Sequence, residues 1–219
     1  MGALTEDTPK PMIAVRGKPL LEHILERLRE AGVQRALIVT GYKAEMIEEY
    51  FAEYPIEIAF RRQEVLNGTA GAAMLAREWV GAEPLLLTYG DILTEVSDYC
   101  GMVARLDAET DAVVVAKWVD DPWQGAAVYE EGGRVIRIVE KPPVGTSTTH
   151  WNSAGSYVFR PVLFEELERV PMSERGEYEL TSALTQMIER GLRLLLYPLE
   201  GAWRDVGRPT DLDAAEKMV

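Results

Sequence analysis

The sequence predicts an α/β protein with a mostly parallel sheet and helices on both faces. In the first half of the chain, short apolar segments that suit buried strands alternate with longer segments whose apolar residues recur at helical spacing. This alternation is typical of parallel sheets, in which a crossover helix follows each strand. The 219 residues are enough to bury a sizeable core without disulfides.

The first half of the chain contains four segments of each kind. We expect strands at 36–39, 56–60, 84–88 and 112–116, and helices at about 20–28, 46–51, 69–79 and 96–106. The first helix has clear end signals, because Pro19 suits a first turn and Gly32 suits a stop. His23 falls within the amphipathic pattern of this helix, so we expect a structural role for it.

The second half of the chain has a different pattern. Strands at 126–129 and 135–139 flank Glu130-Glu131-Gly132-Gly133, which is a hairpin signal. We expect a further strand at 156–160, helices at about 161–169 and 177–190, a strand at 192–197 and a last short helix from Pro209. The chain shows no internal repeat, so one mixed domain over 1–219 is the economical interpretation.

The charge and cysteine content exclude several classes of protein. Asp and Glu number 36 against 23 Lys and Arg, a net charge of −13, which argues against a general nucleic-acid or anionic-membrane surface. No apolar run approaches the roughly 20 residues of a membrane span. The one cysteine, Cys100, excludes a disulfide scaffold and favours a cytoplasmic location. An anionic small substrate remains open, because a few cations or a metal can reverse the local field.

The common catalytic motifs are missing from the sequence. We find no Gly-x-Ser-x-Gly elbow, no Walker loop and no Gly-x-Gly-x-x-Gly after a strand. The two histidines, His23 and His150, are far apart. Hydrolase triads, P-loop kinases and dinucleotide oxidoreductases therefore lose support.

Two charged residues are well placed for phosphate chemistry. Asp91 directly follows an apolar strand, and ligands of open α/β sheets bind at the carboxyl ends of strands. A carboxylate there suits a hard cation such as Mg²⁺, although a turn aspartate is an equally good interpretation. Lys10 stands between Pro9 and Pro11, which stiffen the backbone and suit a fixed phosphate contact. A solvated surface lysine fits the same pattern.

A glycine-containing loop joins an expected strand to the helix that begins near residue 69. Gln63 offers the paired donor and acceptor that can read a base edge. Gly68 permits close approach of the backbone, and Thr69 suits a helix cap. The simpler interpretation is a capped loop.

Taken in order, these segments resemble the sugar-phosphate nucleotidylyltransferase family, and the resemblance runs from Leu4 to about Leu212. The residues that carry it are Leu4-Thr5-Glu6-Asp7-Thr8-Pro9-Lys10-Pro11-Met12, Gln63 with Gly68-Thr69-Ala70, Gly90-Asp91, Glu140-Lys141-Pro142, Ser153-Ala154-Gly155-Ser156-Tyr157 and Trp203-x-Asp205-Val206-Gly207-x-Pro209.

The resemblance implies a fold and a reaction. The family fold is a three-layer α/β/α, Rossmann-like nucleotide-diphospho-sugar transferase domain with a mixed, mostly parallel sheet. The implied partners are a nucleoside triphosphate and a sugar 1-phosphate or similar phosphorylated acceptor, and the implied cofactor is Mg²⁺. The products are a nucleotide-diphospho-sugar and pyrophosphate.

The resemblance also assigns roles to residues of this sequence. Asp91 and Asp205 match the metal-binding carboxylates, and Lys10 matches a phosphate-contacting lysine. Gln63 and Gly68, with Thr69 beside them, match nucleotide-binding positions. The positions that match sugar or sugar-phosphate contacts are Gly125, Glu140, Lys141, Gly155, Tyr157 and Glu179.

Two departures from the family pattern stand out. The family's first strand ends in a glycine-rich, arginine-containing signature, and Met1–Thr5 align just after it. Either Met1 is an internal methionine, with roughly a dozen residues preceding it in the sheet, or the chain is a short form that binds nucleotide poorly or not at all. In addition, Ser153 stands where relatives often have asparagine, and Asn152 comes one residue earlier. A one-residue slip reverses the direction of a side chain, which argues against Asn152 as a sugar ligand.

Several questions stay open from the sequence alone. A catalytically weak binding homologue and a metal-dependent glycosyltransferase of similar fold are the alternatives, although the Asp-x-Asp typical of the latter is replaced by Asp91-Ile92-Leu93. Trp118, Trp123, Trp151 and Tyr157 gather near the expected acceptor region, where they suit sugar stacking, a choline-like cation or ordinary packing. Neither the base, the sugar nor homo-oligomerisation follows from the sequence.

Overall fold

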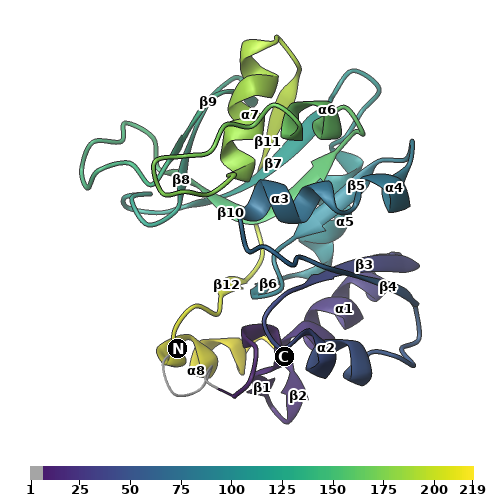
Figure 1. The fold of residues 1–219 in the computed structure, drawn as a ribbon. Coiled ribbons are helices and arrows are strands. Elements are labelled where there is room, and N and C mark those ends of the chain that lie inside the picture. Colours follow the sequence, from purple (N-terminus) through teal and green to yellow (C-terminus); the bar gives the residue numbers. More distant parts are fainter. Residues whose placement is uncertain (1–6) are drawn as a thin grey trace. The chain divides into compact units, whose positions relative to one another are not determined.

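A computed structural model describes residues 7–219 as two compact units, each formed from separate stretches of the chain (Figure 1). The first unit combines 7–64 with Tyr89–Cys100 and Glu200–Val219, and the second combines Val65–Thr88 with Gly101–Leu199. Leu4, Thr5 and Glu6, the start of the family-like pattern, lie outside the described residues. That residues 1–219 form one domain stays a prediction.

The first unit is built from short strands and helices. Its elements are a 3₁₀ turn (Lys10–Met12), β1 (Ala14–Val15), β2 (Lys18–Pro19), α1 (Leu20–Glu30), β3 (Arg35–Thr40), α2 (Ala44–Tyr50), β4 (Glu57–Arg62), β6 (Ile92–Thr94), the start of α5 (Val96–Ala104), β12 (Trp203–Asp205), a second 3₁₀ turn (Pro209–Asp211) and α8 (Leu212–Ala215). β3 and β4 pair in parallel, whereas β6 and β12 pair antiparallel.

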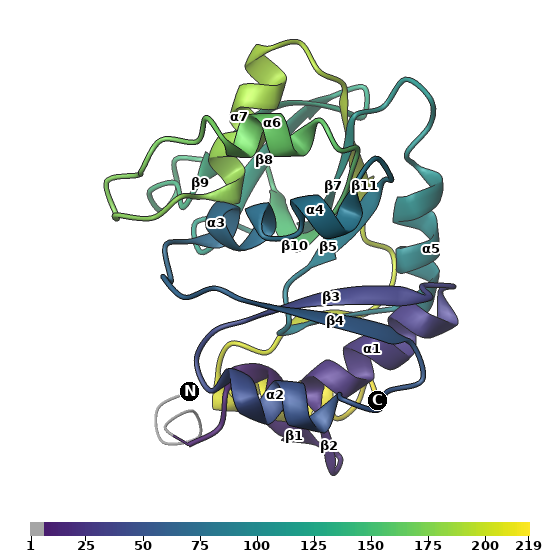
Figure 2. The ribbon, with the colours of Figure 1, turned by 45° about the vertical axis from the view of Figure 1, so that its right-hand side comes forward.

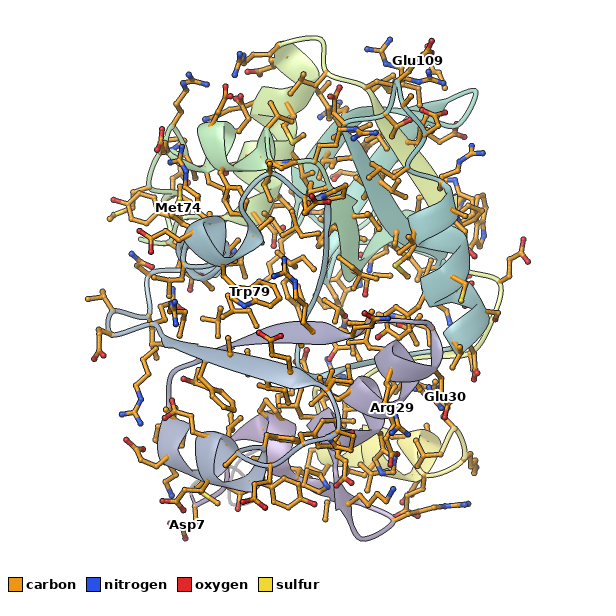
Figure 3. All side chains as sticks on the ribbon, turned by 90° about the vertical axis from the view of Figure 1, so that its right-hand side faces the viewer. Asp7, Arg29, Glu30, Met74, Trp79 and Glu109 are labelled. Carbon is orange, nitrogen blue, oxygen red and sulfur yellow. The ribbon has the colours of Figure 1, made fainter. Side chains whose placement is uncertain are left out.

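Helix α1 packs one apolar face into the first unit and leaves the other to solvent. Leu20, Ile24 and Leu28 are buried, as the periodicity predicted, while Arg29 and Glu30 at the helix end are exposed (Figure 3). His23 is also buried, and its Nε2 lies 2.8 Å from the carbonyl oxygen of Val15. The expected structural role of His23 is thereby confirmed.

The second unit is built on a six-stranded sheet. Its elements are α3 (Thr69–Met74), α4 (Arg77–Val80), β5 (Leu85–Thr88), the end of α5, β7 (Ala112–Trp118), β8 (Ala126–Glu131), β9 (Arg134–Glu140), β10 (Trp151–Phe159), α6 (Leu163–Leu167), α7 (Leu180–Glu189) and β11 (Leu194–Pro198). The strand order is β5-β10-β7-β11-β9-β8. Helices α3, α6 and α7 contact one another, and α7 packs on β9 (Figure 2). The central strand β7 is fully buried from Ala112 to Ala116.

The α/β class is confirmed, but the strand directions differ from the expected mostly parallel arrangement. Among the described pairings of the six-stranded sheet, only β7 with β11 is parallel. The difference arises because β10 lies between β5 and β7 and runs antiparallel to both. In the same sheet, β9 of the β8–β9 hairpin runs antiparallel to β11. Apolar periodicity identifies a strand without giving its direction, so the sequence pattern did not show this.

Several element boundaries also differ from the expectations. The single helix expected at 69–79 is two helices, with Met74 ending α3 and Trp79 in α4 (Figure 3). Strand β10 begins at Trp151 rather than residue 156, and its register shifts between Ser153 and Tyr157, around Gly155. None of the described helices has the length and apolar character that a bilayer crossing requires.

A buried aspartate anchors the segment that carries Asp205. Asp98, near the start of α5, is 1% exposed and accepts hydrogen bonds from the backbone N–H groups of Glu200 (3.2 Å) and Gly201 (3.0 Å). A side chain at Gly201 would overlap this carboxylate. The charged hydrogen bonds therefore set where the chain returns to the first unit, just before β12.

We expect Asp98→Ala to lower the free energy of unfolding by about 2 kcal/mol, because two backbone donors lose a charged acceptor. Urea unfolding of the variant measures this loss. Asp213→Ala, which removes an exposed carboxylate from α8 of the same unit, is the control and should unfold like wild type. An Asp98→Ala variant as stable as wild type would show that this anchor is dispensable.

Candidate active site

Lys10, Asp91 and Asp205 converge in the first unit. Asp91 directly precedes β6 and Asp205 ends β12, and the antiparallel pairing sets Asp205 opposite Ile92. The N–H of Val206 donates to the carbonyl oxygen of Asp91 at 2.9 Å, which holds the two aspartates side by side. The Lys10 ammonium forms an ion pair with Asp91 and lies 3.7 Å from Oδ1 of Asp205. The structure thus brings together the three residues expected to be catalytic.

The local sequence explains how Lys10 reaches this position. Pro9 precedes and Pro11 follows it, and the 3₁₀ turn from Lys10 to Met12 is closed by the N–H of Met12 donating to the carbonyl oxygen of Pro9 at 2.8 Å. Pro11 also borders Gly90, where a side chain would press against its ring. The rigid turn therefore presents the ammonium toward Asp91.

The surroundings of Asp205 disfavour its charged form. Burial raises the pKa of Asp205, the charge of Asp91 raises it further, and Lys10 opposes the effect only in part. Two carboxylates that share one ammonium leave a net negative charge at this point. The cluster is therefore suited to binding a further cation.

The donor set fits magnesium better than a closed metal cage. Asp91 and Asp205 supply carboxylate oxygens, and the described residues contain no group of three or more His, Cys, Asp or Glu arranged to hold a metal. Mg²⁺ is commonly bound by one or two carboxylates and completes its shell with water and substrate phosphates. The two aspartates would hold such an ion and leave positions for phosphate oxygens.

A cavity of about 580 Å³ lies beside Lys10 in the first unit. Thr40, Gly41 and Tyr42, at the carboxyl end of β3, line it together with Pro9 and Gly207. The carboxyl ends of strands are the usual ligand-binding edge of α/β sheets. The cavity therefore gives a small anionic ligand access to Lys10.

Of the expected nucleotide-binding residues, Gln63 falls in the first unit and Gly68 and Thr69 in the second. The N–H of Gln63 donates to the carbonyl oxygen of Thr40 at 2.8 Å, which continues the β3–β4 ladder. The structure does not bring Gln63 together with Gly68 and Thr69 within one unit. Their common role in nucleotide binding stays a prediction.

Gly68 has a structural role that the sequence did not reveal. Its φ of +107° is disfavoured for other residues, and a Cβ would overlap the backbone of Tyr178. The N–H of Ala70 donates to the carbonyl oxygen of Tyr178 at 2.9 Å, and the Thr69 hydroxyl accepts from the N–H of Leu180 at 2.9 Å. Thr69 thus binds the start of α7. We had expected it to cap its own helix, and that expectation was wrong.

A second charged cluster lies in the second unit. Glu140 ends β9 and Glu179 directly precedes α7. Arg175 donates to Oε1 of Glu179 at 2.9 Å, and its Nη2 lies 3.7 Å from Oε1 of Glu140. Burial raises the pKa of Glu140, and the charge of Glu179 adds to this, while Thr181 and Arg175 lower it. Arg175 was not among the residues predicted from the sequence, although a cation four residues before Glu179 was a usable signal.

Strand register decides which side chains share the face of Glu140. Glu140 pairs with Ala126, and Asn152 pairs with Ala127. Because paired residues share a face and neighbours alternate, Ser153 lies on the face of Glu140 and Asn152 on the other. The Ser153 hydroxyl lies 2.7 Å from that of the buried Tyr157. The register thus gives the direction of the Asn152 side chain, and the argument against Asn152 as a sugar ligand stays a prediction.

The remaining expected sugar-phosphate contacts are three backbone-constrained positions. The N–H of Lys141 donates to the carbonyl oxygen of Gly125 at 2.8 Å, and Lys141 has a left-handed φ of +42°. A side chain at Gly125 would overlap the amide of Asn152, which explains the need for glycine there. Gly155, with a φ of +73°, lies at the irregularity of β10. Their contacts with a ligand stay predictions.

Comparison with known proteins shows the family. The model of the nucleotidyl transferase family matches residues 2–219, and the chain belongs to that family. It is 40% identical over 214 residues to the bifunctional protein GlmU of Methanococcus maripaludis strain C5, which covers 97% of this chain and 49% of that protein. It is 33% identical to the UTP–glucose-1-phosphate uridylyltransferase AglF of Haloferax volcanii, covering 99% of this chain and 90% of that protein.

The chain spans about half the length of the GlmU relatives that it matches. Among solved structures, UDP-glucose pyrophosphorylase complexed with UDP-glucose superimposes with a TM-score of 0.86 at 23% identity, covering 96% of this chain and 90% of that one. The apo form of UDP-glucose pyrophosphorylase gives a TM-score of 0.88 at 21% identity, with 100% and 92% covered. These likenesses confirm the expected nucleotidyltransferase fold.

We expect Asp205→Asn to stabilise the protein at pH 7 in the absence of divalent metal. A carboxyl whose pKa rises on folding weakens the folded state as the pH rises from its unfolded pKa to its folded pKa. The gain should stay below about 1 kcal/mol, since the side chain is 54% exposed, and should shrink as the pH falls toward about 4. Urea unfolding between these pH values measures the gain in stability. A variant less stable than wild type at pH 7 would contradict the raised pKa of Asp205.

Proposed function

We propose that this chain acts as a Mg²⁺-dependent nucleotidylyltransferase that couples a nucleoside triphosphate to a sugar 1-phosphate. The observation that carries the proposal is the convergence of Lys10, Asp91 and Asp205 beside a cavity in a member of the nucleotidyl transferase family. Phosphoryl-type transfer asks a protein mainly for positioning and charge neutralisation. This cluster offers both and requires no protein nucleophile.

In the proposed reaction, an oxygen of the sugar phosphate attacks the α-phosphorus of the triphosphate. A new phosphorus–oxygen bond forms, the bond between the α-phosphorus and the bridging oxygen breaks, and pyrophosphate leaves with the electron pair. Bound Mg²⁺ would supply charge neutralisation across the phosphates. Asp91 and Asp205 would hold the ion, which frees Lys10 from its pairing with Asp91 to contact phosphate.

The second unit offers residues for the sugar. Glu140 and Glu179 present carboxylate oxygens that accept hydrogen bonds from sugar hydroxyls, and Arg175 orients both. Gly125, Lys141, Gly155 and Tyr157 complete the proposed sugar-phosphate set. Gln63, Gly68 and Thr69 are the proposed nucleotide contacts.

The relatives suggest which substrates to test first. One is named for UTP and glucose 1-phosphate, and another, 32% identical, is the low-salt glycan biosynthesis nucleotidyltransferase Agl11 of Haloferax volcanii. We therefore propose that the product is an activated sugar for glycan or cell-wall assembly in the cytoplasm. UTP with glucose 1-phosphate is the first pair to assay.

The glycine-rich strand that the family pattern places before Leu4 is a variable of the assay. Assays therefore use both the chain as printed and a form extended by that strand from the Methanococcus relative. If only the extended form turns over, the catalytic cluster is complete but the triphosphate grip needs the added strand. If the printed chain turns over alone, the added strand is dispensable.

We expect Asp91→Asn and Asp205→Asn each to lower pyrophosphate release at least about 100-fold, because each removes a charge that holds the metal at the reacting phosphates. Release is followed with UTP and glucose 1-phosphate in Mg²⁺ and again after chelation with EDTA. Asp213→Asn, at an exposed position of α8, is the matched control and should keep the wild-type rate. Full activity in either aspartate variant, or no release by both forms with any tested pair, would overturn the proposal.

A further inference from the structure

The segment that carries Gly68 and Thr69 lies against the start of helix α7, within the second unit. The N–H of Tyr178 donates to the carbonyl oxygen of Asn67 at 2.7 Å, and the N–H of Ala70 donates to the carbonyl oxygen of Tyr178 at 2.9 Å. Gly68 lies between these two bonds in sequence, and a Cβ there would overlap the Tyr178 backbone. The two stretches therefore contact each other through their main chains.

Thr69 adds a side-chain hydrogen bond to this contact and serves as a cap for α7. The first N–H groups of a helix have no acceptor within the helix. Glu179, at the N-cap of α7, makes no side-chain cap bond, and its Oε1 accepts from the Arg175 guanidinium instead. The Thr69 hydroxyl accepts from the N–H of Leu180 at 2.9 Å. The cap of α7 thus comes from a segment far away in the sequence.

The capped end of α7 carries two residues of the charged cluster. Glu179 directly precedes Leu180, and its Oε1 accepts from Nη2 of Arg175 at 2.9 Å and from Nε at 3.1 Å. Burial raises the pKa of Glu140, the charge of Glu179 adds to this, and a side-chain hydrogen bond from Thr181 opposes it. A shift of the helix start would therefore disturb both of the carboxylates proposed to bind the sugar.

We propose that Thr69 is a positioning residue for the acceptor, because its hydroxyl caps α7 and thereby fixes Glu179 where the sugar phosphate binds. This inference rests on the proposed function and gives the Thr69 side chain a role separate from the nucleotide. The carboxylate of Glu179 extends from the main chain directly beside the capped N–H, so the cap sets its starting point. A hydroxyl that accepts one hydrogen bond can still donate another, so the two substrates have to be tested separately.

A purely structural bond and a positioning bond differ in what they predict. A bond that only stabilises the fold would lower the free energy of unfolding when it is lost, and would leave both KM values unchanged or change them together. A bond that positions Glu179 changes KM for the acceptor and leaves KM for the nucleotide. The difference between the two KM values therefore separates the two roles.

The test compares close variants of Thr69 by steady-state kinetics with UTP and glucose 1-phosphate, in the form of the protein that releases pyrophosphate. Thr69→Val has nearly the same shape but offers no acceptor to the N–H of Leu180. We expect it to raise KM for glucose 1-phosphate about fivefold to tenfold, the effect of one lost hydrogen bond, and to leave KM for UTP within about twofold. Thr69→Ser keeps the hydroxyl and should stay within about twofold of wild type for both substrates. An unchanged KM for glucose 1-phosphate in Thr69→Val, or a rise confined to UTP, would overturn the inference.

A matched control removes a threonine hydroxyl from the same helix, away from its start. The Thr185 hydroxyl donates to the carbonyl oxygen of Thr181 at 3.0 Å, within α7. Thr185→Val should leave both KM values at the wild-type level, because the N–H of Leu180 keeps its acceptor. A rise in KM for glucose 1-phosphate equal to that of Thr69→Val would overturn a specific role for the cap.

A double-mutant cycle tests whether Thr69 acts through Glu179. Glu179→Gln removes the charge of the carboxylate that the cap is proposed to position. In that background, adding Thr69→Val should raise KM for glucose 1-phosphate by less than about twofold, since residues that act through one contact have non-additive effects. The full fivefold to tenfold rise of about one hydrogen bond in both backgrounds would overturn action through Glu179.

A binding experiment separates this inference from the proposed function. Isothermal titration calorimetry measures the binding of glucose 1-phosphate to the chain as printed, in Mg²⁺ and a non-hydrolysable UTP analogue. We expect Thr69→Val to weaken this binding about fivefold to tenfold and to leave binding of the analogue within about twofold. This binding pattern without pyrophosphate release would support the cap and overturn the reaction. Pyrophosphate release together with equal binding in Thr69→Val and wild type would support the reaction and overturn the cap.

Discussion

The proposed chemistry depends on one pairing of two very short strands. β6 and β12 are three residues each, and their antiparallel contact sets Asp91 and Asp205 side by side at Lys10. Residues far apart in the chain therefore form one charged cluster, in which two carboxylates lie near a single ammonium group. Burial raises the pKa of Asp205, and the charge of Asp91 raises it further. A bound divalent cation would neutralise the carboxylate charges. The arrangement that weakens the folded protein without metal therefore favours metal binding.

Neighbouring hydrogen bonds and prolines hold the two aspartates and Lys10 in place. Asp98 binds the backbone of Glu200 and Gly201, and the bond from Val206 to Asp91 continues the ladder at the aspartates themselves. The flanking prolines restrict Lys10 from the other side. In the second unit, Arg175 similarly offsets the carboxylates of Glu140 and Glu179. Each cluster thus combines two carboxylates with one basic side chain. Such a combination suits ligands that carry both phosphate and hydroxyl groups.

The two carboxylates of the candidate site could be predicted from the sequence, because the order of several motifs carries information that a single motif lacks. The apolar strand before Gly90-Asp91 and the Trp203-Arg204-Asp205 segment predicted the two carboxylates. The β6–β12 pairing was not predictable, since three residues carry too little periodicity to indicate a strand. The direction of β10, the overlap of Gly68 with Tyr178 and the partnership of Arg175 depend on contacts between distant segments. Such contacts exist only once the chain is folded.

The most direct test of the metal centre is paramagnetic broadening of backbone amide signals by Mn²⁺, which substitutes for Mg²⁺ at oxygen ligands. The measurement uses ¹⁵N-labelled protein in the presence of UTP. Broadening at low Mn²⁺ should concentrate on the amides of Ile92, Val206 and Gly207, which adjoin Asp91 and Asp205, and should disappear in Asp91→Asn. Broadening that is centred elsewhere, or that persists in Asp91→Asn, would contradict the account.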